Sequence, residues 1–179
     1  MKSVLILSSS PRRDGNSDIL ADAFAEGARE AGHRVEKISL RDKTINFCRG
    51  CLSCQKTLRC VIRDDANDIA QQMKDADVLV FATPIYYYGL SGQLKTMLDR
   101  ANPLYPAEYA FRDIYLLAAA AEAEESAVDG AVTGIEGWIA CFPKSSLKGV
   151  VRGVGATAPG DIRSNAAVID RARSMGRSC

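Results

Sequence analysis

Short apolar runs alternate along the chain with longer segments in which apolar residues recur with the spacing of an α-helix. The runs are rich in Val, Ile and Leu and predict strands at 3–7, 34–40, 77–83, 113–119 and 148–156. The helical spacing predicts helices at 17–32, 64–76, 91–101 and 161–176, and we expect another within 122–142 despite its glycines. Ser17 and Ser91 are the expected N-caps of two of these helices, and Gly32 is the expected end of the first.

This alternation predicts an α/β protein. Near-continuous apolar strands separated by helices are typical of a parallel sheet that is covered on both faces. Five strands in 179 residues favour a doubly wound sheet with strand order 2-1-3-4-5, and we expect one domain over residues 1–179. Ligands of such folds bind beyond the carboxyl ends of the strands, where the strand order reverses. That rule points to 8–17, 83–90 and the stretch after Leu117.

The bulk composition narrows the function classes. Lys plus Arg is 23 and Asp plus Glu is 22, and the charges are scattered, so we expect neither nucleic acid nor a membrane surface as a partner. The longest apolar run, 114–121, is far shorter than the roughly 18 residues of a membrane span. The run 4–7 is too short for the core of a signal peptide. We therefore expect a cytoplasmic protein.

The loop after the first strand, "SSSPRRDGNS", collects groups that bind phosphate. It offers the hydroxyls of Ser10 and Ser17, the guanidinium of Arg12 and the amide of Asn16. Gly15 can adopt a positive φ, which turns backbone N–H groups inward, and the following helix begins with oriented N–H donors. The alternative is a polar turn with a capping serine.

The loop after the third strand, "TPIYYYG", offers planar side chains. Three consecutive tyrosines cannot all point into a core, so at least one lies at a surface or against a ligand. A planar ring ligand needs such faces for stacking. The alternative, compatible with the first, is that the tyrosines form a subunit contact.

Four of the six cysteines lie in the loop after the second strand, which we take as 45–62: Cys48, Cys51, Cys54 and Cys60. Their spacing matches the bacterial ferredoxin pattern only in part. A zinc site typically uses two separated pairs of ligands, which this single loop does not provide. An iron–sulfur cluster and thiols without metal both remain open.

The two loops together resemble the NADPH-dependent FMN reductase family, whose members are flavodoxin-like. "SSPRRDGNS" resembles the family's G-S-P-R-x-x-G-N-[ST], with Ser9 in place of the glycine, and "TPIYYYGLSGQLKTMLDR" resembles its second motif. The resemblance implies that Ser10, Arg12, Asn16 and Ser17 hold the FMN phosphate. It also implies ring contacts from Thr83, Pro84, Ile85, Tyr86 and Tyr87. The loop after the fourth strand carries alanines where donors are expected, so its contacts stay unassigned.

The resemblance implies an FMN-dependent NAD(P)H oxidoreductase, a homodimer or homotetramer, that passes reducing equivalents to a quinone, a flavin, a redox protein or another acceptor. The chemistry would lie on the flavin, so no catalytic side chain is expected. The cysteine loop of this chain resembles that of iron–sulfur flavoproteins, in which the four cysteines hold a [4Fe–4S] cluster. The alternative function is therefore an electron carrier between ferredoxin and FMN. A non-enzymatic nucleotide-binding module is a third. We expect 102–111 to be an exposed aromatic loop at a subunit contact.

Overall fold

Five long strands form a parallel sheet in the structure, a computed structural model that describes residues 1–179. They are β1 (Ser3–Ser8), β2 (Arg34–Ser39), β3 (Val78–Tyr86), β5 (Asp113–Ala119) and β6 (Ser146–Gly153), in the order β2-β1-β3-β5-β6. This confirms the predicted doubly wound order. The labels differ from a simple 2-1-3-4-5 because a two-residue strand, β4 (Gly89–Leu90), pairs antiparallel with the end of β3.

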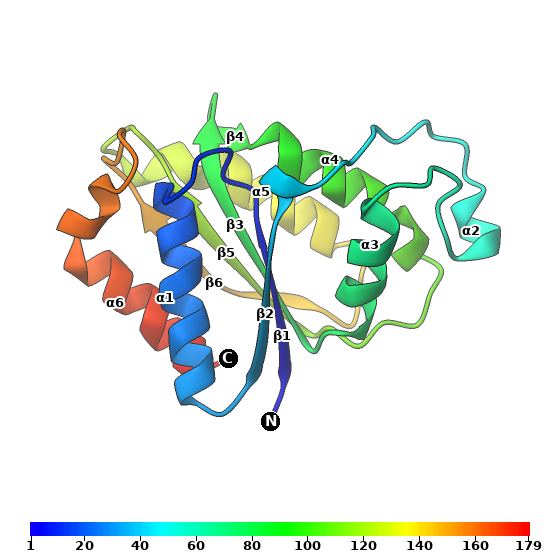
Figure 1. Cartoon of the computed structure of the whole chain (residues 1–179), viewed down its shortest axis with the longest axis horizontal. Helices are drawn as coiled ribbons and strands as arrows, with labels where there is room; N and C mark the ends of the chain where they lie inside the picture. Colours follow the sequence, from blue (N-terminus) through cyan, green and yellow to red (C-terminus); the bar gives the residue numbers. More distant parts are fainter.

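Helices cover both faces of the sheet (Figure 1). α1 (Asn16–Glu30) and α6 (Ala166–Arg177) lie on one face, whereas α3 (Ala66–Asp75), α4 (Gly92–Arg100) and α5 (Asp129–Ile139) lie on the other. Successive residues of β1 and β3 point to the two cores in turn, as strand geometry requires. Both faces are therefore apolar, which explains the continuous apolar runs in the sequence.

The shorter elements connect this framework. The short helix α2 (Cys54–Thr57) lies in the cysteine loop, and four 3₁₀ turns complete the chain: Leu40–Asp42, Asn102–Leu104, Glu125–Val128 and Asp161–Ser164. None of the helices has the length and hydrophobicity of a membrane span.

The helix ends depart from prediction in places. α1 begins at Asn16 with Gly15 as its N-cap, so Ser17 lies in the first turn and does not cap the helix. Ser91 caps α4 as predicted, because its side chain accepts a hydrogen bond from the N–H of Leu94. Gly32 has φ +82 just beyond the end of α1, which is the conformation expected of a terminating glycine. The helix within 122–142 is confined to Asp129–Ile139.

The prediction of an exposed aromatic loop at 102–111 is wrong. Pro103, Leu104 and Phe111 are buried, and of the three aromatic residues in this stretch only Tyr105 is exposed. Phe111 stacks on Trp138 with ring centroids 5.9 Å apart and meets Phe142 at 5.3 Å. These ring contacts come from α5 and the turn after it, which a local reading of 102–111 does not include.

Candidate functional site

A hollow of about 190 Å³ lies beyond the carboxyl ends of four strands. Its walls come from the loops after β1, β3, β5 and β6, which is where ligands bind in doubly wound folds. The lining residues are Ser10, Arg12, Gly15, Asn16, Ser17, Pro84, Ile85, Tyr86, Ala119, Ala121, Ala156 and Thr157. The structure thus brings together seven of the nine residues that the sequence predicted for a cofactor, all except Thr83 and Tyr87.

The N-terminus of α1 forms one wall. The first intrahelical bond of this turn is donated by Ile19 to Gly15, so the backbone N–H groups of Asn16, Ser17 and Asp18 have no intrahelical acceptor. Gly15 has φ −66, so it does not use the positive φ open to glycine, and the left-handed residue of this loop is Asp14. Glycine is required for another reason: a Cβ at position 15 would lie 2.1 Å from the Ser10 hydroxyl oxygen.

The predicted phosphate ligands differ in how free their side chains are. The Ser10 hydroxyl donates to the carbonyl of Arg12 and accepts from its N–H, at 2.9 and 3.2 Å, so its only proton is already used. The Arg12 guanidinium donates one hydrogen bond, to the carbonyl of Thr157. Ser17 is buried, lines the hollow, and its hydroxyl makes no hydrogen bond within the protein. The Ser17 hydroxyl and the remaining N–H groups of Arg12 are therefore free to bind an anion.

Asn16 connects this loop to the segment after β6. Its amide nitrogen donates to the carbonyls of Ala156 at 3.1 Å and Ala158 at 2.9 Å, and its oxygen accepts from the N–H of Ile162. The side chain thus holds the 156–162 segment against α1 and brings Thr157 to the hollow. The sequence pointed to Asn16 but not to this use of its amide.

Two serines and a threonine join the first loop to the hairpin after β3. The Ser91 hydroxyl donates to Ser9 at 2.8 Å, and Ser9 donates to the carbonyl of Ala82. The hydroxyl of Thr83 accepts from the N–H of Ser91 and donates to the carbonyl of Pro84. All three side chains are buried, so Thr83 shapes the hairpin from beneath the hollow and does not line it.

The hairpin between β3 and β4 presents its tyrosines to different surroundings. Tyr86 lines the hollow, whereas Tyr87 is fully exposed and Tyr88 largely so. Tyr86 pairs with Gly89, so Tyr87 and Tyr88 form a two-residue turn, with φ +48 and +63. Positive φ at both positions is the geometry of a type I′ turn, which normally contains glycine or asparagine.

The sequence pointed to one further wall without assigning its residues, and it did not point to another. Ala119 and Ala121 lie at and beyond the end of β5, and Ala156 and Thr157 follow β6. The alanines stayed unassigned because they carry no polar group, but their small size keeps this wall clear. The stretch after β6 was not among the three predicted loops. The rule that ligands meet the carboxyl ends of the strands, applied to the last strand as well, would have found it.

The cysteine loop lies away from this hollow. α2 and the loop around it lie at one end of the molecule, and α1 and α6 lie at the other (Figure 1). The thiol of Cys54 is buried and accepts a hydrogen bond from the amide of Asn102, just beyond the end of α4. Cys48 and Cys51 are exposed, and the backbone of Ser53 lowers the pKa of the Cys51 thiol.

The loop does not form a cluster site in this arrangement. A [4Fe–4S] cluster needs thiolates around one point, but no three metal-ligating side chains of the chain are gathered together. Holding a cluster would require these four cysteines to be rearranged.

A buried ion pair closes the base of the cysteine loop. The two terminal nitrogens of Arg100 donate to the two carboxylate oxygens of Asp64, at 2.7 and 2.9 Å. They also donate to the carbonyls of Asn46 and Ile62, one on each side of the loop. Burial alone would raise the pKa of Asp64, but hydrogen bonds from Arg100 and Asn46 lower it to about 2. Arg100 thus has a structural role.

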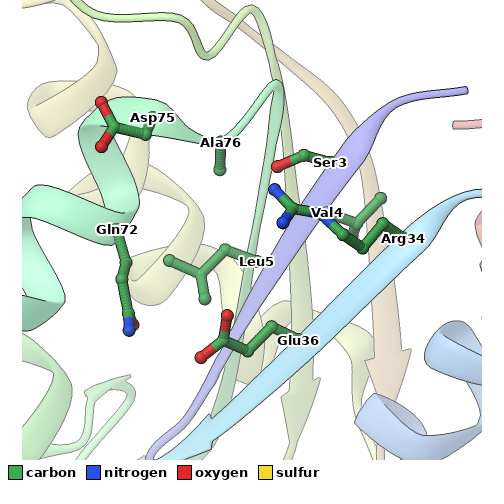
Figure 2. A pocket seen from close by; sticks show the side chains of 8 residues that line it. All are labelled: Ser3, Val4, Leu5, Arg34, Glu36, Gln72, Asp75 and Ala76. Carbon is green, nitrogen blue, oxygen red and sulfur yellow. The ribbon is translucent and has the colours of Figure 1, made fainter.

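A second hollow lies over the amino-terminal halves of β1 and β2, beside the end of α3 (Figure 2). Arg34 and Glu36 project from β2, and Gln72 and Asp75 project from α3. The charges around it are of both signs, and its lining contains no helix N-terminus and no carboxyl end of a strand. This hollow lacks the features that make the first one a candidate for a phosphate-bearing ligand.

Comparison with known proteins identifies the family of the chain. A family model described as NADPH-dependent FMN reductase matches residues 2–143. An iron–sulfur flavoprotein of Methanocaldococcus jannaschii is 41% identical over 101 residues, which cover 56% of this chain and 52% of that protein. YwqN of Bacillus subtilis, named as an NAD(P)H-dependent FMN-containing oxidoreductase, is 29% identical over 98% of this chain and 97% of its own. The match thus spans about half the length of that iron–sulfur flavoprotein.

Solved structures show the same fold. An NAD(P)H:quinone oxidoreductase from Methanothermobacter marburgensis has a TM-score of 0.76 at 22% identity, covering 98% of this chain and 94% of that one. An FMN-dependent NADH-azoreductase of Bacillus anthracis, solved in complex with FMN, has a TM-score of 0.73 at 16% identity and covers 99% of both chains. At these identities the likeness concerns the arrangement of strands and helices.

Proposed function

Because the chain belongs to the NADPH-dependent FMN reductase family, we propose that it is an FMN-dependent NAD(P)H oxidoreductase whose first hollow binds FMN. The observation that carries this proposal is the N-terminus of α1, where free backbone N–H groups and the unpaired Ser17 hydroxyl face the hollow. Such a helix end is a ready anion site. YwqN, which matches almost the whole chain, is named for FMN and NAD(P)H.

The lining fits the phosphate end of a flavin nucleotide. At position 15 the loop has no room for a side chain, so the backbone itself curves closely around the space beside Ser10. The hollow is smaller than the roughly 300 Å³ at which small-molecule pockets begin, so it encloses only part of such a ligand. We assign the phosphate to Ser17, Arg12 and the first turn of α1. The flavin end would then lie toward the hairpin, at Pro84, Ile85 and Tyr86.

Bound FMN supplies hydride acceptance and electron transfer, which no protein side chain provides. The residues of the chain bind and orient it. Asn16 and Ser10 hold the loop in shape, and Thr83 and Ser91 hold the hairpin. The small side chains of Ala119 and Ala121 leave the hollow open on their side to an acceptor such as a quinone or another flavin. The exposed Tyr87 can reach a ligand only from outside the hollow.

The test is a titration of cofactor-free protein with FMN and with riboflavin, which lacks the phosphate. Ser17→Ala should weaken FMN binding about 10- to 100-fold, since a hydrogen bond to a charged group contributes about 1.5–3 kcal/mol. Riboflavin binding should not change. Ser8→Ala is the matched control, because the Ser8 hydroxyl donates to Asp18 and is not in the hollow.

Equal losses for FMN and riboflavin would contradict the phosphate assignment, and no FMN binding by the unaltered chain would contradict the function. Oxidation of NADH and of NADPH, each followed with a quinone as acceptor, then tests the reductase activity and shows which nicotinamide is used.

A second candidate function is an iron–sulfur flavoprotein that carries electrons from ferredoxin to FMN. The spacing of the four cysteines and the similarity to the iron–sulfur flavoprotein of Methanocaldococcus jannaschii favour it. Iron and acid-labile sulfide, measured per chain after purification without oxygen, decide between the two. About four of each per chain would assign Cys48, Cys51, Cys54 and Cys60 as ligands. FMN without iron would leave them as thiols.

A further inference from the structure

A third hollow lies at the same edge of the sheet as the first, on the face that α4 covers. Its volume is about 340 Å³, which is within the range of small-molecule pockets. One wall comes from the chain that follows β2, and the other comes from the first turns of α4 beside it (Figure 1). The lining residues are Leu40, Lys43, Ile45, Phe47, Gly92, Gln93 and Thr96. We call this the α4 hollow, and it shares no residue with the first hollow.

The first wall is an extended segment that the protein holds firmly. Every second residue from 43 to 47 lines the hollow, as in a strand whose alternate side chains share one face. The residues between them are anchored elsewhere. The N–H of Thr44 donates to the carboxylate of Asp65 at 2.7 Å, and the N–H of Asn46 donates to that of Asp64 at 2.8 Å. The buried ion pair at the base of the cysteine loop also holds the carbonyl of Asn46. The wall is therefore formed without a ligand.

This anchored backbone presents an aromatic side chain to water. Phe47 is 79% exposed, whereas Leu40 is buried and Ile45 is half-buried. A side chain so exposed gains little hydrophobic free energy from folding, so its own burial does not hold it there. Together the three side chains form an apolar wall. A flat ring that stacked on Phe47 would remove from water the apolar area that folding leaves exposed.

The polar groups of the α4 hollow have no partners in the protein. Lys43 is the one charged residue of the lining, and its exposed side chain pairs with no carboxylate. The side chains of Gln93 and Thr96 make no hydrogen bond within the chain. The N–H groups of Gly92 and Gln93, in the first turn of α4, also have no intrahelical acceptor. A cation and free donors favour an anion, and the lining contains no carboxylate that would repel it.

We propose that the α4 hollow binds a small aromatic carboxylate. Its ring lies against the apolar wall at Phe47, and its carboxylate faces Lys43 and the first turn of α4. The combination of one apolar wall with one cation argues for this class of ligand. An inorganic anion would leave the apolar wall in water, and a neutral ring would make no use of Lys43. The proposal does not rest on the proposed function, because the two hollows share no residue.

The test is a titration with 2-naphthoate, followed through backbone amide shifts by NMR. The matched ligand is 2-naphthamide, which has the same rings without the charge. We expect saturable shifts at Gly92, Gln93 and 43–47, with a Kd for naphthoate of about 1 mM or tighter. Lys43→Met keeps the apolar stem but removes the charge, so it should weaken naphthoate binding about fivefold and leave naphthamide binding unchanged. Lys56→Met is the control, because Lys56 is exposed, has no ion-pair partner and lies outside the hollow.

A second variant fills the hollow without altering its charge. A Cβ at position 92 would meet no atom within 4 Å, and Gly92 does not have a positive φ. Gly92→Leu should therefore fold, and leucine is also the better helix former. Its side chain would occupy the hollow, so the binding of both ligands should be lost. Thermal melting shows that the variant is folded.

Several results would overturn the proposal. One is the absence of saturable naphthoate binding in the millimolar range, and another is an equal loss of both ligands in Lys43→Met. Binding that survives Gly92→Leu, or that FMN displaces, would place the ligand outside the α4 hollow. Self-association of the chain that excludes naphthoate would assign the hollow to a second copy instead. FMN titration of Gly92→Leu keeps the two proposals apart: naphthoate binding without FMN binding by the unaltered chain refutes only the proposed function, and the reverse refutes only this site.

Discussion

Replacing Arg100 by methionine should be among the most damaging single changes in this protein. The side chain of Arg100 is 0% exposed and that of Asp64 is 2% exposed. Methionine preserves much of the apolar volume but removes the four hydrogen bonds to Asp64, Asn46 and Ile62. Removing one partner of a buried pair leaves an uncompensated charge and typically costs about 3–5 kcal/mol. Small proteins have only about 5–15 kcal/mol of stability in all.

The assay is urea unfolding followed by circular dichroism, with the double variant D64N/R100M beside the single one. D64N/R100M should be more stable than R100M alone, because it no longer buries an unpaired carboxylate. Lys95→Met is the control on the same helix. Lys95 pairs with Asp99 at 2.6 Å, but both side chains are about half exposed, so its loss should cost at most about 1 kcal/mol.

The pH dependence gives an independent check on the cause. The pKa of Asp64 falls from 3.8 to about 2 in the folded chain. The resulting stability, of the order of 2 kcal/mol, is present above pH 4 and is lost as the pH falls from about 4 toward 2. In R100M the burial of Asp64 is unopposed by the guanidinium and raises its pKa, so the variant should recover stability relative to the unaltered chain as the pH is lowered from 7 to 4.

Two results would refute this reasoning. A loss below about 1 kcal/mol in R100M would show that the pair is not the buried anchor that its geometry indicates. Equal stability of R100M and D64N/R100M, or a gap from the unaltered chain that does not change with pH, would show that the damage comes from packing and not from the unpaired charge.

Four further predictions concern the site, its supports and the core. Gly15→Ala should lower both stability and FMN affinity, because its Cβ would clash with the Ser10 hydroxyl, and thermal melting with FMN titration measures both. Asn16→Leu should speed hydrogen exchange in 155–162, because this segment loses three hydrogen bonds. Ser91→Ala should lower the free energy of unfolding in urea by about 1–2 kcal/mol, because it removes the cap of α4 and the buried hydrogen bond to Ser9. Burial raises the pKa of Tyr115 to about 12. The stability that the neutral Tyr115 side chain contributes should therefore be complete below pH 10 and be lost as the pH rises toward 12. Alkaline unfolding of the unaltered chain and of Tyr115→Phe tests this.

The fold could be predicted from the sequence because its strands are buried on both faces. Such strands read as apolar runs without any knowledge of their neighbours, and the order of a doubly wound sheet then limits where a ligand can bind. Short-range signals also held where the partner is near in sequence. Ser91 caps α4 by accepting from the N–H of Leu94, three residues on, and Gly32 has the positive φ of a terminating glycine. Phe111 was mistaken for a surface residue because its partners, Trp138 and Phe142, are far along the chain.

The site was less predictable, because the contacts of its residues come from distant parts of the chain. Asn16 stands in a phosphate-binding motif, but its amide bonds to carbonyls about 140 residues away, and nothing in the local pattern shows that. The glycine at position 15 suggested a positive φ, whereas the structure needs it for the close approach of Ser10. Residue type narrows what a position can do, and the packing around it decides which of those uses is made.

The turn at Tyr87 and Tyr88 shows how the two kinds of information combine. Each tyrosine holds a positive φ that glycine would adopt without strain, and such conformations cost about 1–3 kcal/mol each in other residues. Gly130 packs under the turn against the carbonyl of Tyr88, so the chain accommodates this backbone from below. The exposed Tyr87 side chain gains no burial that would offset the strain. Folding alone therefore does not account for tyrosine at this position, and what favours it must lie outside the isolated chain, in a ligand at the mouth of the hollow or in a second copy.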